Sequence, residues 1–150
     1  MIRDEIKAAQ IAAMKARDPQ TVAATRLIEA AIKNRDIELR TAAAQPEDDL
    51  LVTEVLQKMI KQRRESIEMF RKGNREELAV AEEVEIAVIE RFMPQQMSEA
   101  DMKLAIDAVA TELAATGLKD MGKVMAAVKE RHAGQLDMGK ASALVKARLS

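Results

Sequence analysis

Apolar residues recur at three- and four-residue intervals along the whole chain, and no segment alternates apolar and polar residues as a β-strand would. This spacing predicts a first helix over about residues 2–17 and a second over about residues 19–40. Asp18-Pro19 separates them, because proline disfavours helical backbone in the residue before it and suits the first turn of the next helix. We expect Ile6, Ile28 and Ile32 to face a shared core.

The same pattern predicts a long third helix over about residues 47–72 and a fourth that ends near Phe92. Gly73 is expected to cap the third helix, and Asn74 with Glu77 resembles a capping box for the fourth. Leu78 and Ala81 are expected on the inner side of the fourth helix. Because the connection is so short, the two helices should form an antiparallel hairpin.

Pro94 ends this body, and three shorter helices follow. We expect Ser98 to cap the fifth helix, Met97 to pack on Met102, and Gly117 to end it. The last two helices should run over about residues 120–131 and 137–149. The chain is therefore predicted to be all-α, with a four-helix N-terminal body containing an antiparallel hairpin (1–93) and a small three-helix tail domain (94–150).

The tail contains an internal repeat, since residues 120–123 (DMGK) recur as residues 137–140. The echo continues, because Ala126, Val128, Lys129 and Arg131 recur as Ala143, Val145, Lys146 and Arg148. We interpret Asp120 and Asp137 as helix caps, and Gly122 and Gly139 as points of close helix packing. Anion binding at the two helix N-termini is the alternative, although a capping carboxylate would repel an anion.

Charge is unevenly distributed along the 150 residues. The net charge of the chain is −1, but residues 118–150 hold seven basic and three acidic residues, a net charge of +4. If several of these cations share one face, they could contact a phosphate backbone; otherwise they form a solvated surface. The candidates for nucleic-acid binding are Lys123, Lys129, Arg131, Lys140, Lys146 and Arg148.

Arg63 lies on the apolar side of the third helix, one turn from Met59 and Ile67. A charge in such a position needs a partner. Folding the hairpin about residues 73–74 places Arg63 near Glu85 and Arg64 near Glu82 or Glu83, which predicts a structural ion-pair clasp. The alternative is a phosphate site that Arg63 and Arg64 form with Lys58, Lys61 and Gln62.

The sequence offers little reactive chemistry. It has no cysteine and only one histidine, His132, and it has no glycine-rich phosphate loop. We predict no catalytic residue, no metal site and no cofactor. Residues 1–17 lack the apolar centre of a secretory signal and no run is long enough to span a membrane, so we expect a cytoplasmic location and no membrane partner. The ten methionines are expected to fill the core, and a methionine-lined groove for a partner helix is the alternative.

Five stretches resemble the GatB/YqeY family in the same order along the chain. They are residues 25–34 (TRLIEAAIKN), 57–66 (QKMIKQRRES), 85–90 (EIAVIE), 92–98 (FMPQQMS) and 120–125 (DMGKVM). The chain is similar to a free-standing YqeY-like protein. The resemblance implies an all-α body and tail, and kinship with the C-terminal region of the aspartyl/glutamyl-tRNA amidotransferase B subunit, whose related tail contacts tRNA.

The resemblance implies no chemistry for this chain, because the catalytic parts of the amidotransferase have no counterpart in its sequence. Our first hypothesis is therefore a non-catalytic module that associates with tRNA through the basic tail. The alternative is an adaptor that binds an amidotransferase or a synthetase without contacting RNA. A carbon–nitrogen ligase that uses glutamine is a third possibility, and no nucleophile or nucleotide loop in the sequence favours it.

Overall fold

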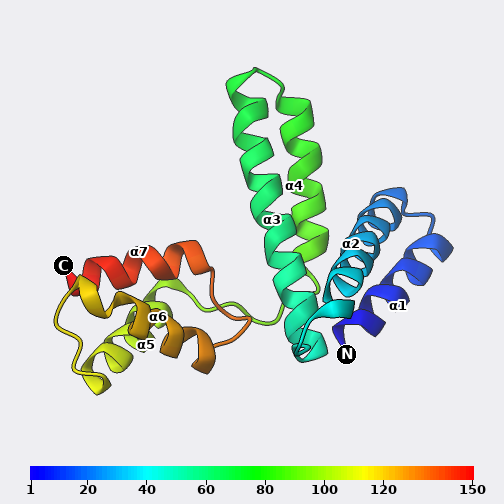
Figure 1. Ribbon diagram of the computed structural model, residues 1–150. Coiled ribbons are helices and arrows are strands. Elements are labelled where there is room, and N and C mark those ends of the chain that lie inside the picture. The colour runs from blue at the N-terminus through cyan, green and yellow to red at the C-terminus, as the bar shows by residue number, and fades with distance from the viewer. The chain divides into compact units, whose positions relative to one another are not determined.

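The computed structural model describes residues 1–150, and all of its regular elements are helical. It confirms the predicted all-α fold. The chain divides into two compact units, Met1–Met93 (unit 1) and Pro94–Ser150 (unit 2). Figure 1 shows the helices of each unit. Each unit has its own hydrophobic core, and the two cores share no residue.

Unit 1 contains four α-helices and one short 3-10 segment. They are α1 (Ile2–Lys15), α2 (Pro19–Glu38), η1 (Leu39–Thr41), α3 (Asp48–Lys72) and α4 (Glu76–Glu90). Helices α3 and α4 form the predicted antiparallel hairpin, and the α1–α2 pair lies against the base of that hairpin (Figure 1). Ile6 and Ile28 are fully buried there against Val52, Leu56 and Ile89.

The outer part of the hairpin is held by its two helices alone, since the core residues of α3 and α4 come from segments 51–60 and 88–89. Beyond them only Ile67 and Ala79 are buried among the apolar side chains of α3 and α4. The expectation that Leu78 and Ala81 point inward is wrong, because both are exposed. Only α3 covers this part of α4, so the buried stripe is narrow and Ala79 occupies it.

Three helices end in the same way, in the Schellman motif. Arg17, Asn74 and Ala114 each have a positive φ, of 57°, 57° and 53°, just after α1, α3 and α5. In each case the following N–H reaches back five residues, as when Arg75 N donates to Phe70 O at 2.8 Å. Asn74 is thus part of this turn, and the predicted capping box is wrong: α4 begins after Arg75 without a side-chain cap.

The start of α3 is bound to both neighbouring helices through charges. The Arg3 guanidinium donates to Asp36 at 2.8 Å and to Asp48 at 2.8 Å, and the N–H of Ile2 donates to Asp49. The hydrogen bond from Arg3 lowers the pKa of the Asp36 carboxyl below its ordinary value. Arg3 therefore joins α1, the end of α2 and the first turn of α3.

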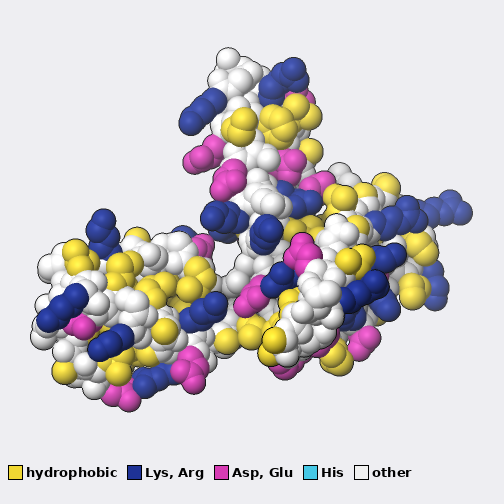
Figure 2. Space-filling view, in the orientation of Figure 1, with side chains coloured by type: hydrophobic (Ala, Val, Ile, Leu, Met, Phe, Trp, Pro, Cys, Tyr) yellow, Lys and Arg dark blue, Asp and Glu magenta, His cyan; other side chains and the backbone are white.

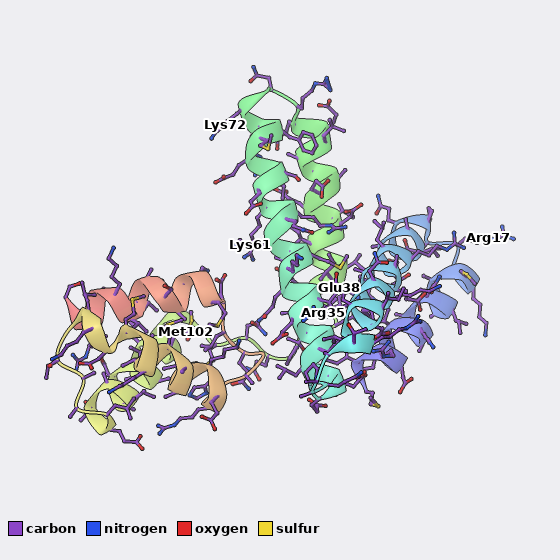
Figure 3. The ribbon with its side chains drawn as sticks, in the orientation of Figure 1. Arg17, Arg35, Glu38, Lys61, Lys72 and Met102 are labelled. Atoms are coloured by element: carbon purple, nitrogen blue, oxygen red, sulfur yellow. The ribbon has the colours of Figure 1, made fainter.

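Unit 2 contains α5 (Glu99–Glu112), the 3-10 segment η2 (Leu118–Asp120), α6 (Met121–Arg131) and α7 (Met138–Leu149). Met102 and Ile106 of α5 are buried in its core, and Figure 3 shows Met102 within the three-helix group. Met97 packs against the same cluster, as the predicted contact with Met102 requires. Ser98 caps α5, because its hydroxyl accepts from Asp101 N at 3.1 Å.

The sequence repeat corresponds to a structural repeat in unit 2. Val124 and Val128 of α6 are fully buried, as are Ala141 and Val145, which stand seventeen residues later in α7. The segment before α5 joins the loop between these helices: Met97 N donates to Gln135 O at 2.9 Å, and the Gln96 amide donates to Gly134 O at 2.8 Å. Each repeat thus presents the same face to the core.

Candidate functional site

The α3–α4 hairpin holds Arg63 against two carboxylates. Arg63 Nε lies 2.7 Å from Glu85 and 3.8 Å from Glu82, and one guanidinium nitrogen donates to Met59 O at 3.3 Å. The Arg63 side chain is only 14% exposed, so water screens this contact less than it screens a surface pair. The ion pairs with Glu85 and Glu82 join α3 to α4, and the hydrogen bond to Met59 O lies within α3.

Arg64 occupies a different environment from the one expected. The sequence places it near Glu82 or Glu83, but the structure places its Nη2 3.8 Å from Glu90, and its side chain is 55% exposed. At the outer end of the hairpin, Arg71 forms ion pairs with Glu76 and Glu83 instead. These carboxylates raise the pKa of Arg71 above its usual value, and the largest cause is the hydrogen bond that Arg71 donates to Glu76.

The solvent-facing side of α3 alternates acids and bases. Lys58 and Lys61 are exposed, and Figure 3 shows Lys61 on the side of α3 away from α4. Acidic residues stand four positions from the lysines, in the pairs Glu54–Lys58, Lys61–Glu65 and Glu68–Lys72. Opposite charges at this spacing stabilise a helix, and their alternation leaves no strip of positive charge for a phosphate.

The six candidate cations of unit 2 are all exposed, but they fall into two kinds. Arg131 pairs with Glu112 at 2.6 Å and Arg148 pairs with Asp107 at 2.8 Å, so the two equivalent arginines of the repeat both bind α5. Arg131 lowers the pKa of Glu112 through the hydrogen bond that it donates. Both arginines are therefore already engaged in holding α6 and α7 to α5.

The remaining four cations are lysines that form no ion pair within unit 2. They are Lys123 and Lys129 of α6 and their equivalents in α7, Lys140 and Lys146. The two lysines of a helix are six residues apart, which places them about 120° apart around the helix axis, at ~100° per residue. Each pair therefore lies on the solvent-facing side of its helix, opposite the buried stripe, and the lysines do not form one line.

The two repeated helix starts differ in structure. Asp137 caps α7, because its carboxylate accepts from Lys140 N at 3.2 Å. Asp120 does not cap α6: it accepts from Thr116 N at 3.0 Å, and this hydrogen bond lowers the pKa of the Asp120 carboxyl. The interpretation of the glycines as packing points is wrong, since both are exposed and nothing lies within 4 Å of a Cβ added at Gly122.

His132 ends α6 and is partly buried. No three side chains among the histidine, aspartate and glutamate residues converge in a way that could hold a metal ion. No helix combines the length and the apolar character that a membrane span requires.

A second group of cations lies on α1 and α2, and the sequence reasoning missed it. Two shallow depressions follow the groove between these helices, with volumes of about 450 and 300 Å³. Their linings include Arg17 and Arg26 in one case and Lys7 and Lys33 in the other. Figure 2 shows Lys and Arg side chains gathered over these helices, and Figure 3 shows Arg17 extending away from their turn.

A local excess of basic residues in the sequence could have indicated this group of cations. Residues 6–35 contain six basic residues (7, 15, 17, 26, 33 and 35) and two acidic residues (18 and 29), so their net charge is +4. The net charge of residues 1–93 as a whole hides this local positive charge, because eighteen acidic residues there outnumber sixteen basic ones. Local charge alone would not place the cations on one groove, because that depends on how α1 packs on α2.

Comparison with known proteins decides the family. The family model described as "Yqey-like protein" matches residues 3–149, nearly the whole chain. The chain belongs to the YqeY-like protein family. This confirms the resemblance found in the sequence, and with it the link to the C-terminal region of the amidotransferase B subunit. No tRNA contact and no catalytic activity follows from family membership.

Among curated proteins, the YqeY-like chain is similar to fungal proteins named "Altered inheritance of mitochondria protein 41, mitochondrial". It is 33% identical over 120 residues to that of Eremothecium gossypii, a match that covers 77% of the chain and 63% of the relative. It is 34% identical over 103 residues to the protein of Lachancea thermotolerans, a match that covers 67% of the chain and 54% of the relative. An uncharacterized protein of Schizosaccharomyces pombe is 41% identical over 64 residues, covering 42% of the chain and 52% of the relative.

These relatives correct one expectation. The sequence reasoning predicts a cytoplasmic location, and this prediction is wrong: the relatives carry "mitochondrial" in their names. The prediction was based on the lack of a secretory signal and of a membrane-spanning run, and neither feature distinguishes the cytosol from the mitochondrial interior. The chain spans between 54% and 63% of the length of the first two relatives.

Proposed function

We propose that this YqeY-like protein is a non-catalytic module that associates with tRNA through unit 2. One observation carries the proposal. The repeat places exposed lysines at matching positions of α6 and α7 (123 and 140, 129 and 146), and none of them forms an ion pair within unit 2. The matching arginines, Arg131 and Arg148, are paired with α5. The unit therefore offers four free ammonium groups on two helices that pack together.

The chemistry of the partner follows from the side chains available. Flexible ammonium groups contact phosphate as point charges and read no base sequence. Unit 2 has no Phe, Tyr or Trp on which a base could stack, because Phe70 and Phe92 both lie in unit 1, and His132 is its single aromatic ring. A folded RNA, recognised by its backbone and shape, fits these groups better than a single strand with splayed bases.

A salt titration with purified tRNA tests the proposal. Binding by the full chain should weaken as salt rises, because each phosphate contact releases counterions. Changing Lys123, Lys129, Lys140 and Lys146 to Gln should lower the affinity and flatten the slope of log K against log salt by roughly 0.7–0.9 for each contact removed.

The matched control changes Lys58 and Lys61 to Gln, two exposed lysines of α3 that stand among acids. This variant should keep the wild-type affinity and slope. If the full chain binds no tRNA at low salt, or if the unit 2 variant binds as tightly as the wild type, the proposal fails.

A protein-binding role is the second candidate function, for an amidotransferase or a synthetase as partner. It is favoured by apolar side chains that α2 leaves in water: Leu27 is 46% exposed and Ile37 is 45% exposed. Partners recovered from a lysate treated with nuclease would separate it from the first candidate, since an association through RNA would not survive that treatment.

A further inference from the structure

Helix α2 is apolar on two opposite sides. One side packs into the core of unit 1 through Ala24, Ile28 and Ile32. The other side is exposed and carries a stripe that we name the outer seam of α2, formed by Ala23, Leu27, Ala30, Asn34 and Ile37. An exposed apolar stripe on a helix whose other side is already buried marks a surface on which a further element can pack.

The outer seam has the spacing of a coiled-coil contact. Its residues are separated by four, three, four and three positions, which keeps them within about 80° around the helix axis, at ~100° per residue. Asn34 is the one polar member of the seam. A single polar residue in such a seam sets the register of the partner helix at some expense of stability.

One flank of the outer seam is basic. Arg26 and Lys33 stand seven residues apart beside it, both are exposed, and neither forms an ion pair. Lys7 and Arg17 line the same α1–α2 groove as Lys33 and Arg26, respectively, so α1 adds two more cations on this flank. Two acids near the seam are already occupied, since Asp36 binds Arg3 and Glu38 binds Arg35 at 2.9 Å. Glu29 lies beside Lys7 and Lys33 in the groove, but the four cations outnumber it, so the flank stays basic.

We propose that the outer seam of α2 is the docking surface for an amphipathic helix of a partner protein, with an apolar stripe at heptad spacing and a flank of Asp and Glu. The charge pattern argues for this occupant. Acidic side chains on the partner would complement Arg26 and Lys33 on α2 and Lys7 and Arg17 on α1. This inference rests on the second candidate function and does not require unit 2 to bind tRNA.

A second copy of the chain is a poorer occupant. Antiparallel pairing of two α2 helices would place Arg26 and Lys33 of one copy against the same cations of the other, which is repulsive. Parallel pairing would offer Lys33 only Glu38, which already binds Arg35. A phosphate backbone is also a poorer occupant, because it would leave Leu27 and Ile37 facing water.

The test uses two synthetic helical peptides of about 21 residues, long enough for three heptads. Both carry Leu at the seam positions; one has Glu at the flanking positions and the other has Lys. Fluorescence anisotropy with the full chain should give an affinity for the Glu peptide at least about tenfold higher than for the Lys peptide. The proposal is overturned if neither peptide binds or if both bind equally.

Seam variants show where the peptide binds. Leu27→Gln with Ile37→Gln should weaken binding of the Glu peptide by about tenfold or more, since it removes two apolar contacts. The control pair is Met69→Gln with Leu104→Gln, which are 73% and 69% exposed and lie outside the seam. That pair should bind as the wild type does, and circular dichroism should show full helicity for both variants. Wild-type binding by the seam variant overturns the proposal.

Flank variants test the charge pattern. Arg26→Glu with Lys33→Glu should reverse the preference, so that the Lys peptide binds more tightly than the Glu peptide. Lys58→Glu with Lys61→Glu, on α3, should leave the preference unchanged. If this variant still binds the Glu peptide more tightly than the Lys peptide, the proposal that the partner helix has an acidic flank is overturned.

Two further results would assign the surface to another occupant and overturn the proposal. If the wild type sediments as a dimer and Leu27→Gln with Ile37→Gln as a monomer, the seam is covered by a second copy. If Arg26→Glu with Lys33→Glu abolishes tRNA binding while the seam variant retains it, the flank contacts nucleic acid. Binding of tRNA by the unit 2 lysines is measured separately. A negative result in that experiment would not change the interpretation of peptide binding.

Discussion

Arg63 illustrates how one charged residue can occupy the apolar side of a helix. Its neighbours on α3, Met59 and Ile67, are buried, and its own side chain is 14% exposed. The guanidinium is compensated by Glu85 at 2.7 Å and by Glu82 at 3.8 Å. Both carboxylates stand on α4, so the contact fixes the register of the two helices where few apolar side chains are available to do so.

We expect Arg63→Met to lower the free energy of unfolding by about 1–2 kcal/mol, because it removes the charge-assisted hydrogen bond to Glu85. Amide exchange should accelerate in the outer hairpin (residues 61–85) more than in α1 and α2. The control is Arg64→Met, whose side chain is 55% exposed and which should cost about 0–1 kcal/mol. An unchanged melting temperature for Arg63→Met would show that the clasp does not stabilise the hairpin.

The Asp36 carboxylate should make the stability of unit 1 depend in part on pH in the acid range. Arg3 lowers the pKa of this carboxyl in the folded state, so its contribution is present above the ordinary pKa of about 4 and is lost as the pH falls below that value. Asp36→Asn should therefore destabilise the protein by about 0.5–1 kcal/mol at neutral pH and by less near pH 3. Urea unfolding at both pH values measures this.

The control for Asp36 is Asp4→Asn, an exposed residue of α1 whose side chain forms no ion pair. Its effect on stability should be small at both pH values. A cost for Asp36→Asn that is the same at neutral and acid pH would mean that the ion pair with Arg3 is not its origin.

At the scale of the helices, α1, α3 and α5 end in the same turn, although a different residue type occupies its left-handed position in each. Arg17, Asn74 and Ala114 all take the left-handed conformation for which glycine is best suited. The prediction that Gly73 caps α3 is confirmed, because Gly73 is the C-cap residue of that helix. The prediction that Gly117 ends α5 is wrong, because α5 ends at Glu112 and Ala114 takes the left-handed position. The motif depends on hydrogen bonds across the turn, such as Ala115 N to Ala110 O at 2.9 Å, and tolerates other residues at some strain.

Ala114→Gly should relieve that strain in unit 2. A left-handed alanine costs roughly 1 kcal/mol relative to glycine, so we expect a gain in stability of about 0.5–1 kcal/mol. The matched substitution is Ala108→Gly, at an exposed position inside α5, which should cost about 0.5–1 kcal/mol. If the conformation of Ala114 is as described, the two variants should shift the melting temperature in opposite directions. Shifts in the same direction would contradict it.

At the scale of the whole molecule, the chain has two cores that share no residue. The core of unit 1 is built around Ile6, Ile28 and Leu56, and that of unit 2 around Met102, Ile106 and Val128. Because each unit buries its own apolar side chains, a defect in one core should be confined to that unit.

Ile106→Ala tests this independence. Ile106 is 1% exposed, and its truncation should destabilise unit 2 by about 2–4 kcal/mol through lost burial and a residual cavity. Hydrogen exchange should show lost protection in α5, α6 and α7, while amides near Ile28 and Leu56 keep theirs. Loss of protection in both units would show that they unfold together.

The helical class, the α3–α4 hairpin and the contact of Arg63 with Glu85 could be predicted from the residues alone, because local periodicity and a short connection leave few alternatives. The family could be recognised in the same way. Helix packing, in contrast, was needed to show that Arg131 and Arg148 are bound by α5, that Arg64 lies near Glu90, and that Lys7, Arg17, Arg26 and Lys33 line one groove. Those outcomes depend on the rotation of each helix about its axis, which packing between distant segments sets and which no local pattern of residues encodes.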